Sequence, residues 1–375
     1  MITHYKEIIN ERKNWEKGYF NLARYLDNIL SAHPEVEQFF KYVPQILLNY
    51  RRGLMFGHLY IHQSLPRMLT LWFFYGKTLP EYFEEKKPKK KSNNENINSP
   101  RAIFDSMNEQ MKKALEKLPS YQFLTSFPQL ISRICHETKE VVEILDKIII
   151  KVLSDYMQQA LWAMISLSKS NNEIRKTTTE SIFKTACSKN KPLSTLLNSF
   201  KNFANLIVDI SNEKKKEEIS RLLFRLDKEL KSSKHQTSPV VPTLKSLTPV
   251  LTASGRHENN HKIFSDLSQI CIIGMSTTCE VMKTLAAPKK IQCMGSGFYF
   301  YFYFCFYFCF YFLFFIFIFI FIFIIYYFYF YFIFLFYFLF FYFIFYLFFY
   351  FLFIFLNRRS ELHFFGQTKR RFEKG

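Results

Sequence analysis

The sequence predicts an all-α fold: an α-solenoid of stacked helix pairs, followed by a low-complexity aromatic run. Two observations predict the helices. Apolar residues recur at helical spacing through the first 230 residues, and no part of residues 1–285 shows the sustained alternation of a hairpin strand. The predicted helices have lengths of about 15–25 residues and short connections, which favours antiparallel neighbours.

Three segments carry the clearest helical pattern. Trp15, Tyr19, Leu22 and Leu26 lie at positions i, i+4, i+7 and i+11, which places them on one helical face. Residues 141–152 and 219–230 repeat this spacing of apolar side chains. Residues 170–173, Ser-Asn-Asn-Glu, fit a capping box, in which the Ser and Glu side chains satisfy the first N–H groups of a helix.

Composition shifts divide the chain into four regions. Residues 84–100 are charged, Asn-rich and bounded by prolines, so we expect a disordered loop within the first region. The first region, at 1–230, is helical. The second, at 231–297, begins with an irregular segment containing Pro, Ser and Thr, residues 231–260, which is called the crossing below. The aromatic run at 298–356 and a basic tail at 357–375 follow.

Overall composition excludes several protein classes. The chain has 375 residues and a formal net charge of +19, and its 59-residue aromatic run contains 29 of the 47 Phe. The remaining residues have ordinary globular content, which excludes collagen-like, wholly disordered and disulfide-stapled chains. Seven scattered Cys without a C-x-x-C pair indicate reduced thiols in an intracellular protein, and the N-terminus shows no secretory signal.

Histidine spacing raises the question of a metal site. Residues 257–261 read His-Glu-Asn-Asn-His, the spacing with which a helix presents two zinc ligands and a general base. The surrounding Thr, Ser, Gly and Asn disfavour a helix, so an exposed loop is the favoured interpretation. His58 and His62 are also four residues apart and are expected on one helix, as a packed or surface pair. Cys135 and His136 are interpreted as packing residues.

No catalytic residue and no metal site are predicted for this chain. Gly295, Ser296 and Gly297 form a lone G-x-G, and no G-x-x-x-x-G-K-[ST] phosphate loop is present. No Ser/His/Asp or Cys/His pairing can be argued from spacing.

Three blocks of sequence together resemble a known family. Residues 62–76 (HQSLPRMLTLWFFYG), 119–136 (PSYQFLTSFPQLISRICH) and 156–170 (YMQQALWAMISLSKS) resemble, in order and spacing, the end of the FAT region of ATR-type checkpoint kinases. These belong to the phosphatidylinositol-3-kinase-related kinase family. Residues 14–30 resemble an earlier helix of that region. Residues 239–244 (PVVPTL) and 287–297 (APKKIQCMGSG) resemble the start of the kinase amino-terminal lobe, where a strand leads to the phosphate-covering loop.

The resemblance covers about residues 1–297 and implies tetratricopeptide- or HEAT-like helix pairs that curl around a kinase domain. It also implies ATP- and Mg²⁺-dependent phosphorylation of Ser or Thr, in the nucleus, in response to DNA damage and stalled replication. The implied partners are the rest of the solenoid, the kinase domain and proteins that bind helical surfaces.

The family pattern stops after Gly297. The Lys of the following strand, the GDRHxxN catalytic loop and the DFG-like metal-binding Asp are missing. We therefore expect an inactive FAT-region fragment with a truncated kinase domain and no cofactor of its own. Gly295, Ser296 and Gly297 are at most a vestige of the phosphate-loop start.

Three interpretations compete for the aromatic run. A translated T-rich intron in a faulty gene model is favoured, because Phe, Tyr, Ile, Leu and Cys all have T-rich codons and no other residue occurs. A strand-forming, aggregating segment describes how such a chain would behave. A membrane span is the third, and it gives the alternative function of a tail-anchored protein with a helical cytosolic interaction domain.

Basic stretches at 86–91 and in the tail raise nucleic-acid binding as a further hypothesis. No recognition fold accompanies them, so direct contact with nucleic acid is not favoured.

Overall fold

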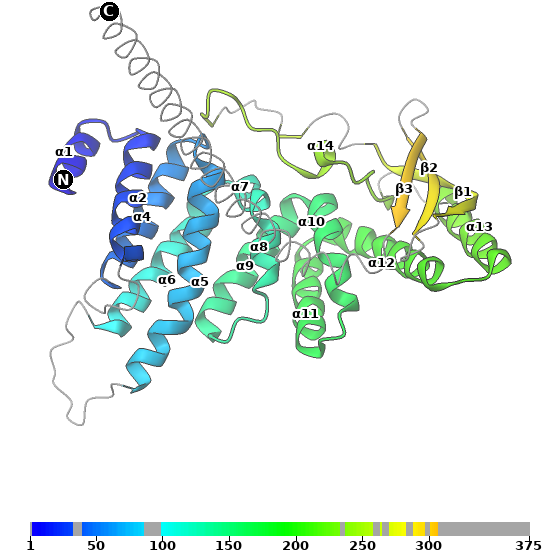
Figure 1. The fold of residues 1–375 in the computed structure, drawn as a ribbon, viewed down its shortest axis with the longest axis horizontal. Coiled ribbons are helices and arrows are strands. Elements are labelled where there is room, and N and C mark those ends of the chain that lie inside the picture. Colours follow the sequence, from blue (N-terminus) through cyan, green and yellow to red (C-terminus); the bar gives the residue numbers. More distant parts are fainter. Residues whose placement is uncertain are drawn as a thin grey trace, which may run out of the picture. The chain divides into compact units, whose positions relative to one another are not determined.

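The computed structural model describes residues 2–32, 40–85, 99–232, 237–257, 263–264, 270–282, 288–296 and 301–306 (Figure 1). The chain divides into two compact units, Met1–Phe306 and Tyr307–Gly375. All described residues belong to the first unit, and the second lies outside them.

The first half of this unit is a row of helices in which each packs on its neighbours, for example α2 on α4, α4 on α5 and α6, and α6 on α9 (Figure 1). The helices are α1 (Ile2–Glu11), α2 (Glu16–Ala32), α4 (Tyr42–Phe56), α5 (Ile61–Glu85), α6 (Pro100–Lys117), α7 (Ser120–Thr125), α8 (Phe127–Ser132) and α9 (Lys139–Asp155).

The second half continues the row, with α9 on α11, α11 on α12 and α12 on α13. Its helices are α10 (Met157–Met164), η1 (Ile165–Lys169), α11 (Glu173–Lys189), α12 (Lys191–Asn212), α13 (Lys216–Ser232) and the single turn α14 (Leu244–Leu247). The helical fold class predicted from the sequence is confirmed.

The predicted apolar faces are the buried ones. Tyr19, Leu22 and Leu26 are buried on α2, and the apolar residues at the same spacing on α9 and α13 also face the core. Trp15 comes just before α2, and its ring lies so close to Gly18 that a Cβ there would be 2.7 Å from ring atom Cε3. These helices are therefore held by burial of one stripe each, as the spacing indicated.

Two boundaries differ from the sequence expectation. The predicted capping box at Ser170 is wrong, because η1 runs to Lys169 and Asn172 is the residue that caps α11, accepting from the N–H of Arg175 at 3.0 Å. The expected loop at 84–100 is shorter than predicted, because α5 continues through Glu85 and α6 already begins at Pro100. Residues 86–98, with the basic stretch, lie outside the described residues.

The buried apolar residues form two clusters. The larger extends from Ile9 to Phe200 and the smaller from Phe203 to Cys293. Trp162 of α10 packs against both, with edge-on contacts to Phe200 and Phe203 at centroid distances of 5.4 and 5.8 Å. This indole therefore joins the helical core to the core under the sheet.

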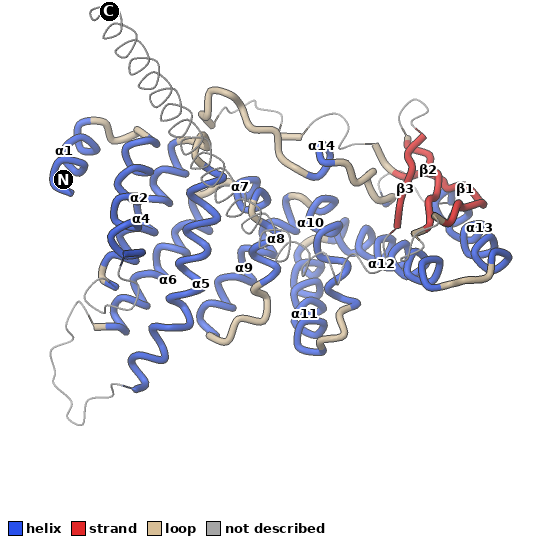
Figure 2. The backbone as a smooth tube through the Cα atoms, in the orientation of Figure 1, coloured by secondary structure: helices blue, strands red, loops and turns tan. Residues whose placement is uncertain are grey.

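A three-stranded antiparallel sheet follows the helices, in the order β1-β2-β3 (Figure 2). The strands are β1 (Ile272–Val281), β2 (Lys289–Gly295) and β3 (Tyr301–Phe306). β1 forms within residues 1–285, where the sequence shows no sustained strand alternation. Its register with β2 shifts twice, and its burial alternates only at the start, so no clean period of two appears in its sequence.

β2 lies within the block at 287–297, for which the family resemblance implied a strand. Only the backbone of β3 is described, and the rest of the aromatic run lies outside the described residues. Among the helices that the structure describes, none combines the length and apolar character needed to cross a bilayer.

Candidate functional site at the junction of helices and sheet

The sheet rests on α13, the last long helix of the row (Figure 1). Ile272 and Met275 of β1 and Ile291 and Cys293 of β2 are buried with the apolar face of α13, formed by Ile219, Leu223, Leu226 and Leu230. This junction is where a strand resembling a kinase lobe meets the helical stack, so it is the candidate functional site.

Asp227 is a buried carboxylate on the face of α13 that carries the sheet. Its Oδ1 accepts a hydrogen bond from the N–H of Met275 at 2.9 Å, and its Oδ2 accepts from Nζ of Lys231 at 2.7 Å. A Cβ on Gly274 would lie 3.0 Å from Oδ1 and 2.6 Å from Cε of Met294, so glycine permits this close approach. A charged acceptor thus fixes β1 at one point along α13.

Lys289 connects β2 to the C-terminal end of α12. The residue is buried, and its Nζ donates to the carbonyl oxygen of Ser211 at 2.7 Å, one residue before α12 ends. A cation at this place satisfies a terminal carbonyl and opposes the negative end of the helix dipole. Burial lowers the pKa of Lys289, and the neighbouring Cys279 and Glu213 act in the opposite direction.

The crossing lies along α10, which holds it through side-chain hydrogen bonds. Nε1 of Trp162 donates to the carbonyl oxygen of Val240 at 2.9 Å. Gln158 accepts from the N–H of Val240 at 3.1 Å and donates to the carbonyl oxygen of Ser238 at 3.0 Å. Both backbone groups of Val240 are therefore satisfied by α10, as buried peptide groups require.

The same segment also forms the outer edge of β1. The N–H of Val241 donates to the carbonyl oxygen of Ile270, and the N–H of Ile272 donates to that of Pro239, both at 2.8 Å. The block at 239–244 is therefore bridged to residues 270–272, which lead into β1, and β1 in turn pairs with the strand block at 287–297.

The predicted phosphate-loop vestige serves the sheet. Gly295 ends β2, where a Cβ would lie 2.9 Å from Cγ2 of Ile270. Ser296 donates its N–H to the carbonyl oxygen of Cys271 and accepts from the N–H of Cys271 on its Oγ, both at 2.9 Å. Gly297 lies outside the described residues. The backbone N–H of Ser296 and an acceptor position of its Oγ are therefore occupied by Cys271, the residue before β1.

The histidines differ from expectation. His58 lies in the turn before α5 and is buried, whereas His62 is exposed on that helix, so the prediction that one helix carries both is wrong. The exposed-loop interpretation is wrong for His257, which is half-buried and hydrogen-bonded through both ring nitrogens. Glu258 and His261 lie outside the described residues. Across the described ranges, no group of three or more His, Cys, Asp or Glu side chains could hold a metal ion.

Cys135 and His136, which precede α9, were both predicted to be packing residues, and this is only partly correct. His136 accepts from the N–H of Thr138 on Nδ1 at 3.1 Å, and its Nε2 donates to the carbonyl oxygen of Phe73 at 3.0 Å. Cys135 is exposed, contrary to prediction.

Sequence reasoning missed Asp227, Lys289, Gln158 and Trp162. One signal was available for Asp227: it lies between Leu226 and Leu230 on a helical face that is otherwise apolar. Nothing local marks the other three, because their partners are backbone groups about 80 residues away in sequence.

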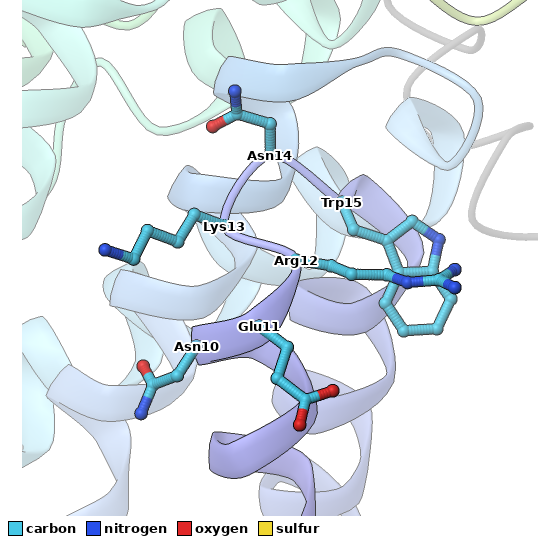
Figure 3. A pocket seen from close by; sticks show the side chains of 6 residues that line it. All are labelled: Asn10, Glu11, Arg12, Lys13, Asn14 and Trp15. Atoms are coloured by element: carbon cyan, nitrogen blue, oxygen red, sulfur yellow. The ribbon is translucent and has the colours of Figure 1, made fainter.

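A surface hollow of about 470 Å³ lies at the turn between α1 and α2, lined by residues 10–15. Its side chains point in different directions, apart from Arg12, which lies along the ring of Trp15 at 5.9 Å from the centroid (Figure 3). No convergent set of polar groups forms there, so the junction is the better candidate.

Comparison with known proteins agrees with the resemblance. Residues 106–204, from α6 into α12, match the family described as ATR-like serine/threonine-protein kinase HEAT repeats. The serine/threonine-protein kinase ATR of Oryza sativa subsp. indica is 28% identical over 78% of this chain, and that of Arabidopsis thaliana 28% over 79%. Protein kinase rad3 of Schizosaccharomyces pombe is 24% identical over 80%. The chain is therefore similar to one segment of ATR-type kinases.

The chain spans 12% of the length of the two plant relatives and 13% of rad3. Among solved structures, the FAT and kinase domain of CtTel1 is similar, with 15% identity, a TM-score of 0.48, and coverage of 78% of this chain and 19% of that one. The family match includes Gln158 and Trp162, which hold the crossing, and ends before Ser211 and Asp227.

Proposed function

We propose that this chain is a scaffold of an ATR-type serine/threonine protein kinase that acts in DNA-damage and replication-stress checkpoint signalling. Its task is to position the first strands of a kinase amino-terminal lobe against the last helix pair. The observation that carries this proposal is the double attachment of the sheet, by Asp227 to β1 and by Lys289 to β2. The similarity to protein kinases supports the signalling role.

The chain itself does not transfer phosphate in this proposal. ATP and Mg²⁺ belong to the kinase domain of the parent protein, because the sequence lacks the phosphate-binding Lys and the metal-binding Asp. The commitment of Ser296 to Cys271 agrees with this assignment. The partners are then the remaining solenoid, the kinase domain and proteins that bind helical surfaces in the nucleus, with no direct nucleic-acid contact.

The scaffold proposal is tested by hydrogen–deuterium exchange of the 375-residue chain with Lys289→Met. Removing the ammonium leaves the Ser211 carbonyl without its donor, so faster exchange is expected in β2 and at the end of α12. Lys290→Met is the matched control, because Lys290 follows Lys289 on β2 and pairs with the exposed carboxylate of Glu280 at 3.5 Å. Equal effects of the two substitutions would contradict the proposed attachment.

Two further measurements test the kinase assignment. The purified chain, given MgATP and a Ser-Gln peptide, should leave the peptide unphosphorylated, and any phosphotransfer that depends on this chain would contradict the proposal. Sequencing of the mature transcript across codons 295–358 should show the aromatic run spliced out and followed by codons for the missing Lys and Asp. A retained run would refute the link to a catalytic parent at this locus.

A further inference from the structure

The distal end of the crossing is fastened to the corner between α4 and α5. The N–H of His58 donates to the carbonyl oxygen of Gly255 at 2.7 Å. Gly255 has a φ of +69°, and a Cβ there would lie 2.8 Å from Cβ of Leu59. Both the backbone conformation and the close approach therefore require glycine. Residues 252–257 are called the strap below.

A chain of hydrogen bonds closes over this contact, and its direction can be assigned. The carbonyl oxygen of Leu54 only accepts, so Nε2 of His257 donates to it at 2.9 Å. In a neutral ring Nδ1 carries no proton, so it accepts a hydrogen bond from the Tyr121 hydroxyl at 2.8 Å. That hydroxyl oxygen accepts from Nδ1 of His58 at 3.1 Å, which leaves Nε2 to accept from Oγ1 of Thr252 at 3.1 Å.

Among the described residues, the other titratable groups at the corner include a carboxylate, a phenol and a guanidinium. Glu16 of α2 accepts from the N–H of Tyr60 at 2.9 Å, and burial raises its pKa while His257 opposes the rise. Burial also raises the pKa of Tyr121 to about 12, with Tyr156 and Glu16 contributing in the same direction, so the hydroxyl keeps its proton. Arg256 of the strap is exposed.

The hydrogen bonds described at the corner accommodate one added proton. One added proton on His257 reverses the chain: Nδ1 then donates to Tyr121, the hydroxyl donates to His58, and Nε2 of His58 donates to the carbonyl oxygen of Thr252 at 3.3 Å. With a second proton, both Nδ1 atoms donate to one hydroxyl, whose own proton loses its acceptor. Two cationic rings then lie 5.6 Å apart, one of them on the buried His58.

We propose that His58, Tyr121 and His257 form a proton-sensitive latch, which holds the strap with no or one added proton and opens when both imidazoles are protonated. The open strap can hydrate both charges and the closed corner cannot, so the open state binds more protons and acid favours it. The attachment at α10 uses Trp162 and Gln158, which do not titrate. Acid should therefore free the strap and leave the proximal part of the crossing in place.

The test is hydrogen–deuterium exchange of the 375-residue chain at about pH 7.5 and about pH 5.5, a range in which imidazoles change charge. The reporter is the amide of His58, which the strap covers, and the internal reference is the amide of Val240. After correction for intrinsic exchange rates, we expect protection of the His58 amide to fall at least tenfold in acid. Protection of the Val240 amide should not change. Unchanged protection of the His58 amide would overturn the proposal.

Variants assign the effect to the imidazoles. His257→Gln keeps a donor for Leu54 but cannot be protonated, so it should abolish the pH dependence, while the exposed His62→Gln control should retain it. If Glu16→Gln abolishes the effect instead, the carboxylate is the titrating group and the latch is refuted. A wild-type titration of the histidine rings by NMR covers the case of a variant that fails to fold. Two protonated rings with a still protected His58 amide would also refute the latch.

Discussion

Removal of the Asp227 side chain should loosen β1 from α13. In Asp227→Ala the buried N–H of Met275 loses its acceptor, and a hydrogen bond to a charged group contributes roughly 1.5–3 kcal/mol. The pair with Lys231 adds little, because 57% of the Lys231 side chain is exposed and such pairs contribute about 0.5 kcal/mol. The expected cost is therefore about 2–3 kcal/mol in the free energy of opening the sheet from the helix.

Hydrogen–deuterium exchange at β1 measures this directly. A cost of about 2–3 kcal/mol corresponds to roughly 30- to 150-fold faster exchange of the Met275 amide, since about 1.4 kcal/mol is a factor of ten. Asp227→Asn keeps an acceptor and should show a smaller effect, and Lys231→Met should change exchange less than threefold. The reasoning fails if Lys231→Met equals Asp227→Ala, because the ion pair and not the amide bond would then hold the strand.

The remaining predictions concern other parts of the unit. Trp162→Phe should cost about 1 kcal/mol in urea unfolding, because the carbonyl oxygen of Val240 loses its donor while the ring contacts largely remain; no cost would contradict that role. Gly255→Ala should release the strap at neutral pH, seen as proteolysis at 252–257, because a Cβ collides with Leu59 at positive φ; an intact strap would refute this. Burial raises the pKa of Asp146 to about 6 and leaves Oδ1 without a partner, so the folded state holds the proton more tightly than the unfolded state. Stability should then fall as pH rises from about 4 to 6, and Asp146→Asn should add on the order of 2 kcal/mol at pH 7.5 and nothing at pH 4; equal gains at both pH values would argue against titration.

The sequence predicted the helices well where apolar residues recur every three or four positions. Tyr19, Leu22 and Leu26 are buried together because one helical face of α2 meets α4. The strand β1 escaped prediction because register shifts break its alternation. The capping box at Ser170 was misplaced because two candidate caps, Ser170 and Asn172, follow each other closely, and the end of η1 decides between them.

The sequence by itself determined the helical class, the ATR-type resemblance and the absence of catalytic motifs from the chain, because these depend on local spacing and on residue identity. Only the tertiary structure decided the junction and the strap. Asp227, Lys289 and His257 have partners 48 to 203 residues away in sequence. A hydrogen bond of this kind depends on where two distant segments come to lie after the helices pack, and no local pattern encodes that distance.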